Sequence, residues 1–109
     1  MLPEHEQLAT RVASERRAGR TVAFANGCFD LLHVGHVRYL EASAEEADVL
    51  VVALNDDAGV RLLKGEGHPL LSQEERRYVV GSIKFVKQAL ISTGDGWLFG
   101  FGSTQDYSD

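Results

Sequence analysis

Residues 21–44 read TVAFANGCFDLLHVGHVRYLEASA, and this stretch decides the fold of the chain. It opens with an apolar run over residues 21–25, which is typical of a buried strand. It leads into residues 34–47, whose pattern is that of a helix. A turn between a strand and a helix leaves free backbone N–H groups at the helix start, where anions bind. The stretch therefore predicts an anion site at the connection between the two elements.

Two histidines stand at this predicted helix start. His33 and His36 are three residues apart, so a helix places both rings on one side. Gly35 lies between them and lets a ligand come close to the backbone. Imidazole N–H groups donate hydrogen bonds to phosphate oxygens, and the helix dipole adds positive potential at the same point. The pattern predicts a site at which a phosphate is held and also stabilised during a reaction.

The rest of the chain continues the alternation of strands and helices. Residues 4–18 have helical spacing, and Gly19 is expected to end that helix. Residues 48–54 form a near-continuous apolar run, as expected of a parallel strand covered on both faces. The remaining predicted elements are a short helix over 56–63, a helix over 72–82 that opens with the capping box Ser72 to Glu75, and a weaker strand over 85–91. This order predicts a three-layer α/β Rossmann-like fold with a short parallel sheet.

The predicted topology also brings together segments that are far apart in the sequence. Ligands of such sheets bind at the carboxyl ends of the strands. Residues 26–30, 55–57 and 91–95 each follow a predicted strand, so they should converge at one edge. We predict a single domain over 1–109, which consists of an N-terminal helix (1–19), a core (20–92) and an atypical tail (93–109). The last residues of that tail, 103–109, are polar and are expected to fray.

The bulk composition narrows the class of protein. The chain has 109 residues, enough for one small domain with one core. Its net charge of -5 argues against a nucleic-acid partner, which needs a basic stripe. Cys28 is the single cysteine, so no internal disulfide can form, and a reducing, cytoplasmic location is expected. The acidic residues 1–6 are no secretory signal, and no run is long enough to span a bilayer, so a membrane is not an expected partner.

The run over residues 26–36, NGCFDLLHVGH, resembles the signature of the cytidylyltransferase-like nucleotidyltransferases. That family combines a Gly-x-Phe-Asp turn with a His-x-Gly-His motif. Later segments look like further landmarks of the family in the expected order, namely ALNDD (53–57), VRLLKG (60–65) and ERR (75–77). The resemblance covers about residues 21–91, and within the family it is greatest to the members that adenylylate heptose 1-phosphate.

The resemblance implies transfer of an adenylyl or cytidylyl group from ATP or CTP to a phosphorylated small acceptor, with release of pyrophosphate. The expected acceptor is a sugar phosphate such as heptose 1-phosphate, and Mg²⁺ is expected to accompany the triphosphate. The resemblance implies catalytic roles for His33, His36 and Lys64. The nucleotide-binding residues that it implies are Asn26, Gly27, Cys28, Phe29, Asp30, Gly35, Asn55 and Arg76.

Several of these residues also have other interpretations. An isolated histidine pair is more often a packing or capping feature, but the ordered set of motifs favours function for His33 and His36. With Asp30 they could form a two-histidine, one-carboxylate metal set, although the flanking turn fits a phosphate better and no metal site is predicted. Asp30 could also cap the helix or hold a substrate group. Cys28 could be a small buried filler, and Arg77 belongs to a solvated helix face.

The end of the chain departs from the family pattern. Residues 91–94, ISTG, resemble a late family motif in letters but come directly after the third strand, so we interpret them as its end. The expected late segment is missing, which leaves a second hypothesis: a nucleotide-binding or scaffold remnant with little or no turnover. Large apolar residues gather at 97–101, and the strand over 85–91 leaves an unpaired sheet edge. We therefore expect a homodimer.

Overall fold

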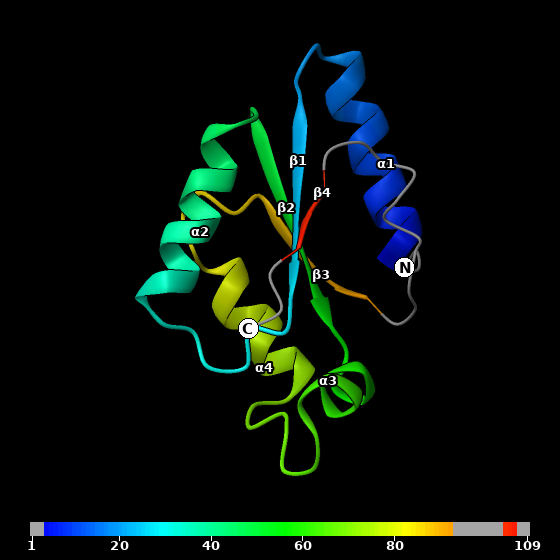
Figure 1. The fold of residues 1–109 in the computed structure, drawn as a ribbon. Helices are drawn as coiled ribbons and strands as arrows, with labels where there is room; N and C mark the ends of the chain where they lie inside the picture. Colours follow the sequence, from blue (N-terminus) through cyan, green and yellow to red (C-terminus); the bar gives the residue numbers. More distant parts are fainter. Residues whose placement is uncertain (1–3, 93–103, 107–109) are drawn as a thin grey trace.

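The computed structural model describes residues 4–92 and 104–106, which form a parallel sheet flanked by helices (Figure 1). Within these residues the strands lie in the order β3-β2-β1-β4. The strands are β1 (Val22–Gly27), β2 (Val49–Asn55), β3 (Gln88–Ser92) and β4 (Thr104–Asp106). The helices are α1 (Glu4–Arg17), α2 (Val34–Glu45), α3 (Asp57–Lys64) and α4 (Gln73–Gly81). This arrangement confirms the predicted α/β Rossmann-like fold.

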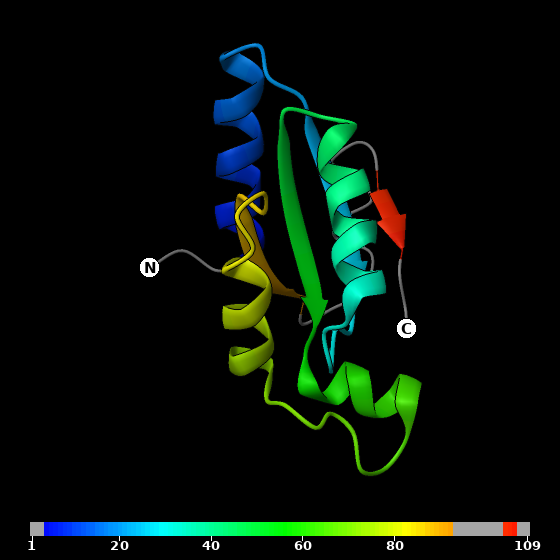
Figure 2. The ribbon, with the colours of Figure 1, turned by 90° about the vertical axis from the view of Figure 1, so that its left-hand side faces the viewer.

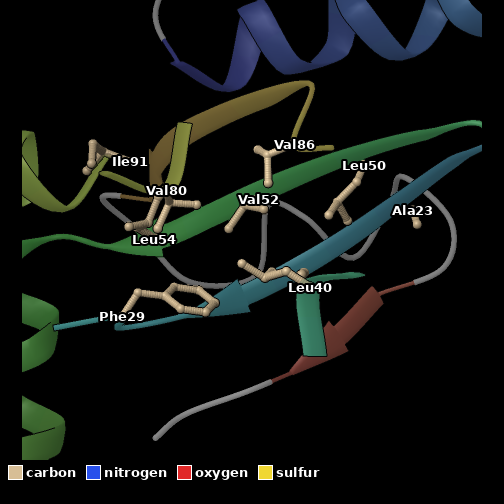
Figure 3. Packing of buried hydrophobic residues seen from close by; sticks show 10 residues of the cluster. Ala23, Phe29, Leu40, Leu50, Val52, Leu54, Val80, Val86 and Ile91 are labelled. Atoms are coloured by element: carbon tan, nitrogen blue, oxygen red, sulfur yellow. The ribbon is translucent and has the colours of Figure 1, made fainter. Parts of the chain in front are cut away.

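The alternation of side chains along the strands builds three layers. One sheet face carries a buried cluster into which α2 places Leu40 and α4 places Val80 (Figure 3). On the opposite face α1 packs Leu8 and Val12, and Figure 1 shows α1 across the sheet from α2 and α4. Successive side chains of a strand point to opposite faces. Both clusters therefore draw on β2, the first taking Leu50, Val52 and Leu54 and the second taking Val49, Val51 and Ala53.

The register of the strands sets where the following segments emerge. β1 and β2 pair from Val22 opposite Val49 to Gly27 opposite Leu54. β3 pairs in the same direction, with Ser92 opposite Asn55. Because the three strands end at one level, the segments that follow β1 and β2 leave the sheet side by side. Figure 2 views the sheet from the side of α2 and α4 and shows these ends near α3.

Side chains close in sequence cap the starts of α3 and α4. Ser72 and Glu75 form the capping box of α4, since each side chain accepts a hydrogen bond from the other residue's backbone N–H. Asp56 caps α3 by accepting the Gly59 N–H at 2.8 Å. After α1, Gly19 adopts a φ of +80°, a conformation that glycine takes without steric cost. These local contacts explain why the helix starts were readable from the sequence.

The structure corrects two expectations about the strands. The third strand begins at Gln88 rather than at residue 85, because residues 82–86 form local turns after α4 and their N–H groups bond to nearby carbonyls. The polar residues 104–106 form β4, which pairs in parallel with residues 24–26 of β1. We expected these residues to fray because they are polar. They form a strand because a three-residue edge strand relies on backbone hydrogen bonds and needs no apolar pattern. The apolar group at residues 97–101 lies outside the described residues.

In the part of the chain that the structure describes, every helix is too short or too polar to traverse a lipid bilayer.

Candidate functional site

Three segments meet at the carboxyl ends of the strands. The first is the turn over residues 28–33 after β1, and the second is Asn55–Asp57 after β2. The third is the segment over residues 65–72, which connects α3 to α4 at the same end of the molecule (Figure 1). The convergence that the topology predicted is therefore confirmed for the ends of β1 and β2. The third strand ends at Ser92, and residues 93–95 lie outside the described residues.

The histidine pair lies at the start of α2. His33 is the N-cap residue, and its extended backbone turns the chain into the helix. The two rings are stacked at a tilt, with centroids 3.8 Å apart and an angle of 33° between their planes. His33 is exposed, whereas His36 is buried and meets the edge of Phe29 at a centroid distance of 5.5 Å. The sequence prediction that both rings lie on one side of the helix is confirmed.

The backbone fixes the tautomer of both rings. Gly35 N–H donates to His33 Nδ1 at 3.0 Å, and His33 N–H donates to His36 Nδ1 at 3.1 Å. A ring nitrogen that accepts a hydrogen bond carries no proton, so each neutral ring holds its proton on Nε2. Each ring therefore carries an Nε2–H group, the kind of donor that binds a phosphate oxygen; that of His33 lies on an exposed side chain, whereas the Nε2 of His36 is buried.

Phe29 shapes the turn that leads to the histidines. Its φ of +49° lies in the left-handed region, which non-glycine residues seldom adopt. The side chain is 2% exposed and belongs to the same core cluster as Leu40 of α2 (Figure 3). Burial of the large ring holds the backbone in this unusual conformation. Phe29 therefore supports the site from the core side, beneath His36, rather than from the solvent side.

Asp30 does not cap α2, because His33 occupies that position. The Asp30 carboxylate instead accepts the N–H groups of Leu70 and Leu71 at 2.8 and 3.0 Å, and its Oδ2 lies 3.1 Å from His68 Nδ1. Burial acts to raise the pKa of Asp30, but the hydrogen bonds from Leu70, Leu71 and His68 together lower it below its usual value. Asp30 is therefore an ionised anchor for the segment before α4.

Arg76 lies beneath the site rather than at its surface. Its side chain is 0% exposed. The guanidinium donates to Cys28 O at 2.8 Å, to Asn55 O at 2.7 Å, to Leu71 O at 3.1 Å and to Asp57 Oδ1 at 2.8 Å. These contacts use four of the five donors of an arginine. The predicted contact between Arg76 and a nucleotide phosphate is not supported by this position, since the group is committed to the chain itself.

The other predicted residues surround the turn in different ways. Gly27 is buried at the end of β1, and Asn26 precedes it with its side chain half-buried. Cys28 is buried and its thiol donates to Asn55 Oδ1 at 3.7 Å, as fits a small filler. Lys64 is exposed at the last position of α3, which stands at this end of the sheet (Figure 2).

Sequence reasoning missed His68 as a participant of this region, and it missed the partner of Asp57. Asp57 was visible as an acidic residue in the first turn of α3, but its partner Arg76 is 19 residues away. His68 lies in the Gly-rich segment between two helices, 38 residues from Asp30. Neither pairing follows a local spacing rule, so no signal in a single sequence indicates it.

The structure does not assemble the alternative metal set. Among residues 4–92 and 104–106, no group of three or more histidine, cysteine or acidic side chains is arranged to hold a metal ion. Asp30 turns to the Leu70–Leu71 segment, and both Nδ1 atoms of the histidines accept backbone N–H groups. The histidine pair therefore fits an oxyanion better than a metal cation.

A hollow of about 480 Å³ lies away from these residues, near the amino ends of the strands. Its lining includes Glu15, Arg20, Asp48, Lys84 and Lys87. Its two carboxylates already pair with protein groups, since Glu15 contacts Arg20 and Asp48 accepts the Thr21 N–H. Ligands of doubly wound sheets bind at the carboxyl ends of the strands, so this hollow is not the candidate site.

Comparison with known proteins agrees with this geometry. Residues 24–96 match the model of the cytidylyltransferase-like family. The protein named bifunctional protein HldE from Syntrophotalea carbinolica is 44% identical over 90 residues, which is 83% of this chain and 18% of that protein. The HldE protein of Geobacter sulfurreducens is 46% identical over 88 residues, which is 81% of this chain and 18% of that protein. The chain thus spans about a fifth of the length of these curated relatives.

A solved structure shares the fold. The crystal structure of the lipopolysaccharide core biosynthesis protein from Thermoplasma volcanium GSS1 superposes with a TM-score of 0.69 at 29% identity. The match covers 76% of this chain and 69% of that one. The chain belongs to the cytidylyltransferase-like family, whose model spans the turn, the histidines and α4.

Proposed function

We propose that this domain transfers a nucleotidyl group from a nucleoside triphosphate to a phosphorylated small acceptor and releases pyrophosphate. The observation that carries the proposal is the pair of imidazoles at the start of α2, whose Nδ1 atoms are occupied by backbone N–H groups. Their Nε2–H groups and the helix start supply hydrogen bonds and positive potential for phosphate oxygens. Family membership supports the same chemistry.

In the proposed reaction a phosphate oxygen of the acceptor attacks the α-phosphorus of the triphosphate, and the bond to pyrophosphate breaks. Negative charge on the transferred phosphoryl oxygens is then stabilised by His33 and His36. Fixed donors need no reorganisation during the step, which is why they accelerate it. Lys64, exposed at the end of α3, is proposed to neutralise the remaining phosphates.

Magnesium is proposed to accompany the triphosphate. Mg²⁺ usually keeps several waters and is bound through substrate phosphates with one or two carboxylates. The nearby carboxylates of Asp30 and Asp57 are engaged with Leu70 and with Arg76. The residues present therefore fit an ion that arrives with its phosphate ligands, for which it would supply charge neutralisation.

For the acceptor we favour a sugar phosphate such as heptose 1-phosphate, and for the donor ATP before CTP. The likeness to proteins named HldE and to a lipopolysaccharide core biosynthesis protein supports the acceptor. We propose that the protein is located in the cytoplasm.

A second candidate function is nucleotide binding without turnover. The position of Arg76 favours it, because a guanidinium expected to contact phosphate is committed to Cys28, Asn55, Leu71 and Asp57. The site then has fewer cations with which to stabilise the transferred group.

One screen tests both candidates. ATP and CTP are incubated with a panel that contains heptose 1-phosphate, glycerol phosphate, phosphocholine and flavin mononucleotide, and pyrophosphate is measured. Acceptor-dependent release supports the transferase. Triphosphate binding by titration without release supports the second candidate, and a chain that neither binds nor turns over contradicts both.

A further inference from the structure

The Asp30 carboxylate connects the histidine turn to a distant segment. It accepts the N–H of Leu70 at 2.8 Å and that of Leu71 at 3.0 Å, while His68 Nδ1 lies 3.1 Å from Oδ2. Asp30 itself is 8% exposed and stands three positions before His33. A single buried carboxylate thus gathers three groups from a segment about forty residues further along the chain.

Arg76 holds the same segment from beneath. Its Nε donates to Leu71 O at 3.1 Å, and its Nη1 donates to both Cys28 O and Asn55 O. The end of the segment is therefore clamped between a carboxylate, which takes its N–H groups, and a guanidinium, which takes a carbonyl. Asp30 belongs to the connection after β1, and Arg76 contacts that connection at Cys28 O.

The beginning of the segment is held only loosely in comparison. Gly65 and Gly67 both have positive φ, and a Cβ added at either would meet no atom within 4 Å. The backbone N–H groups of Gly65 and His68 make local hydrogen bonds, to Arg61 O and to Gly65 O respectively. The position of the segment relative to the histidines therefore depends on its anchored end at Leu70 and Leu71.

We propose that Asp30 is a positioning residue, which acts on the proposed nucleotidyl transfer through the segment over residues 65–71 and does not touch the substrate. By fixing Leu70 and Leu71 it sets where the segment that follows Lys64 lies relative to His33 and His36. His68 adds a contact from the partly exposed side of the same carboxylate. We call the contacts of Asp30 with Leu70, Leu71 and His68 the latch. The expected effect on nucleotide binding rests on the proposed function, whereas the latch does not.

Amide hydrogen exchange tests the latch without any substrate. In Asp30→Asn the carboxylate charge is lost, and we expect exchange at the Leu70 and Leu71 amides to accelerate about tenfold or more relative to the wild-type chain. Asp48→Asn is the matched control. Asp48 also accepts a backbone N–H at 2.8 Å, but from Thr21, at the amino ends of the strands. Unchanged exchange at both amides in Asp30→Asn, in a protein that remains folded, overturns the proposal.

His68→Ala provides a second variant if Asp30→Asn fails to fold. Its side chain is 39% exposed, so the substitution removes one contact without disturbing the core. We expect faster exchange at Leu70 and Leu71 than in the wild type, with Asp48→Asn again unchanged. The latch is contradicted if neither His68→Ala nor Asp30→Asn exchanges faster. It is also contradicted if Asp30→Asn is unfolded and His68→Ala shows no acceleration.

A double-mutant cycle tests whether the latch acts through Lys64. We expect Asp30→Asn and Lys64→Ala each to weaken ATP binding by about three- to tenfold, and the double variant to bind no more weakly than Lys64→Ala alone. Fully multiplicative losses, or unaltered affinity in Asp30→Asn, overturn the positioning role. A wild-type chain that binds no triphosphate rejects the proposed function instead, and amide exchange then decides on the latch alone.

Discussion

At the scale of single residues, the two histidines differ in their surroundings although they share one motif. His33 is exposed and caps α2, whereas His36 is buried against Phe29. Each ring is oriented by one backbone N–H, but only His36 also fills space in the core. His33 is therefore the better position at which to separate catalysis from folding.

Replacement of either histidine by alanine is expected to lower the rate of pyrophosphate release about a hundredfold or more, because one fixed donor to the transferred phosphate is lost. Thermal unfolding should show a smaller effect for His33→Ala than for His36→Ala, since only His36 is buried. Arg77→Ala serves as the control, because Arg77 pairs with Glu74 on the surface. Wild-type turnover in both histidine variants would remove the catalytic role.

The two neighbouring arginines of α4 should behave in opposite ways. Arg76→Ala leaves three backbone carbonyls and Asp57 without their buried partner, and we expect a loss of roughly 3 kcal/mol or more in the free energy of unfolding. Arg77→Ala removes an exposed pair with Glu74 and should change it by less than about 1 kcal/mol. Urea denaturation of both variants measures the difference. Equal stability would mean that the buried contacts of Arg76 are not needed for folding.

At the scale of elements, the segment between α3 and α4 makes the site sensitive to acid. The pKa of Asp30 is lower in the folded chain than in the unfolded chain, so in that range the unfolded state binds more protons. Asp30 therefore contributes its full stabilisation above the ordinary pKa of an aspartate and loses it as the pH falls through the lowered value.

We expect the wild-type chain to lose stability over the pH window that runs from the ordinary pKa of an aspartate down through the lowered pKa of Asp30 in the folded chain. Asp30→Asn should be less stable at neutral pH, and its stability should fall less across this window. Glu15 and Glu75 also have lowered pKa values and add to the acid effect in both proteins. Parallel curves for the two proteins from thermal unfolding would show that Asp30 is not an ionised anchor.

At the scale of the whole molecule, several large apolar side chains face solvent. Leu62 is 88% exposed and Leu63 is 61% exposed on α3, and Leu31, Val34 and Leu70 are exposed near the histidine turn. In the described residues β3 is the last strand on its side of the sheet, so its outer edge has no strand beside it. Exposed apolar side chains and open strand edges are features that a second copy of a chain can cover.

We expect self-association at micromolar concentration, as a homodimer, and a shift toward monomer in Leu62→Glu. Val79→Glu on α4 is the matched control, because Val79 is also exposed but lies on a different helix. Sedimentation equilibrium measures both variants beside the wild type. A monomeric wild-type chain contradicts self-association, and an equal shift in both variants contradicts the role of α3.

The sequence by itself determined the order of the elements, the helix starts and the histidine turn. These features arise from contacts between near neighbours, such as Ser72 with Glu75 or His33 with Gly35, and from the period of apolar residues. Only the tertiary structure decided that Arg76 is buried, that Asp30 holds Leu70, and that residues 104–106 join the sheet. Those contacts join residues tens of positions apart, and strand register and packing select the partners. No spacing rule within one sequence encodes such a choice.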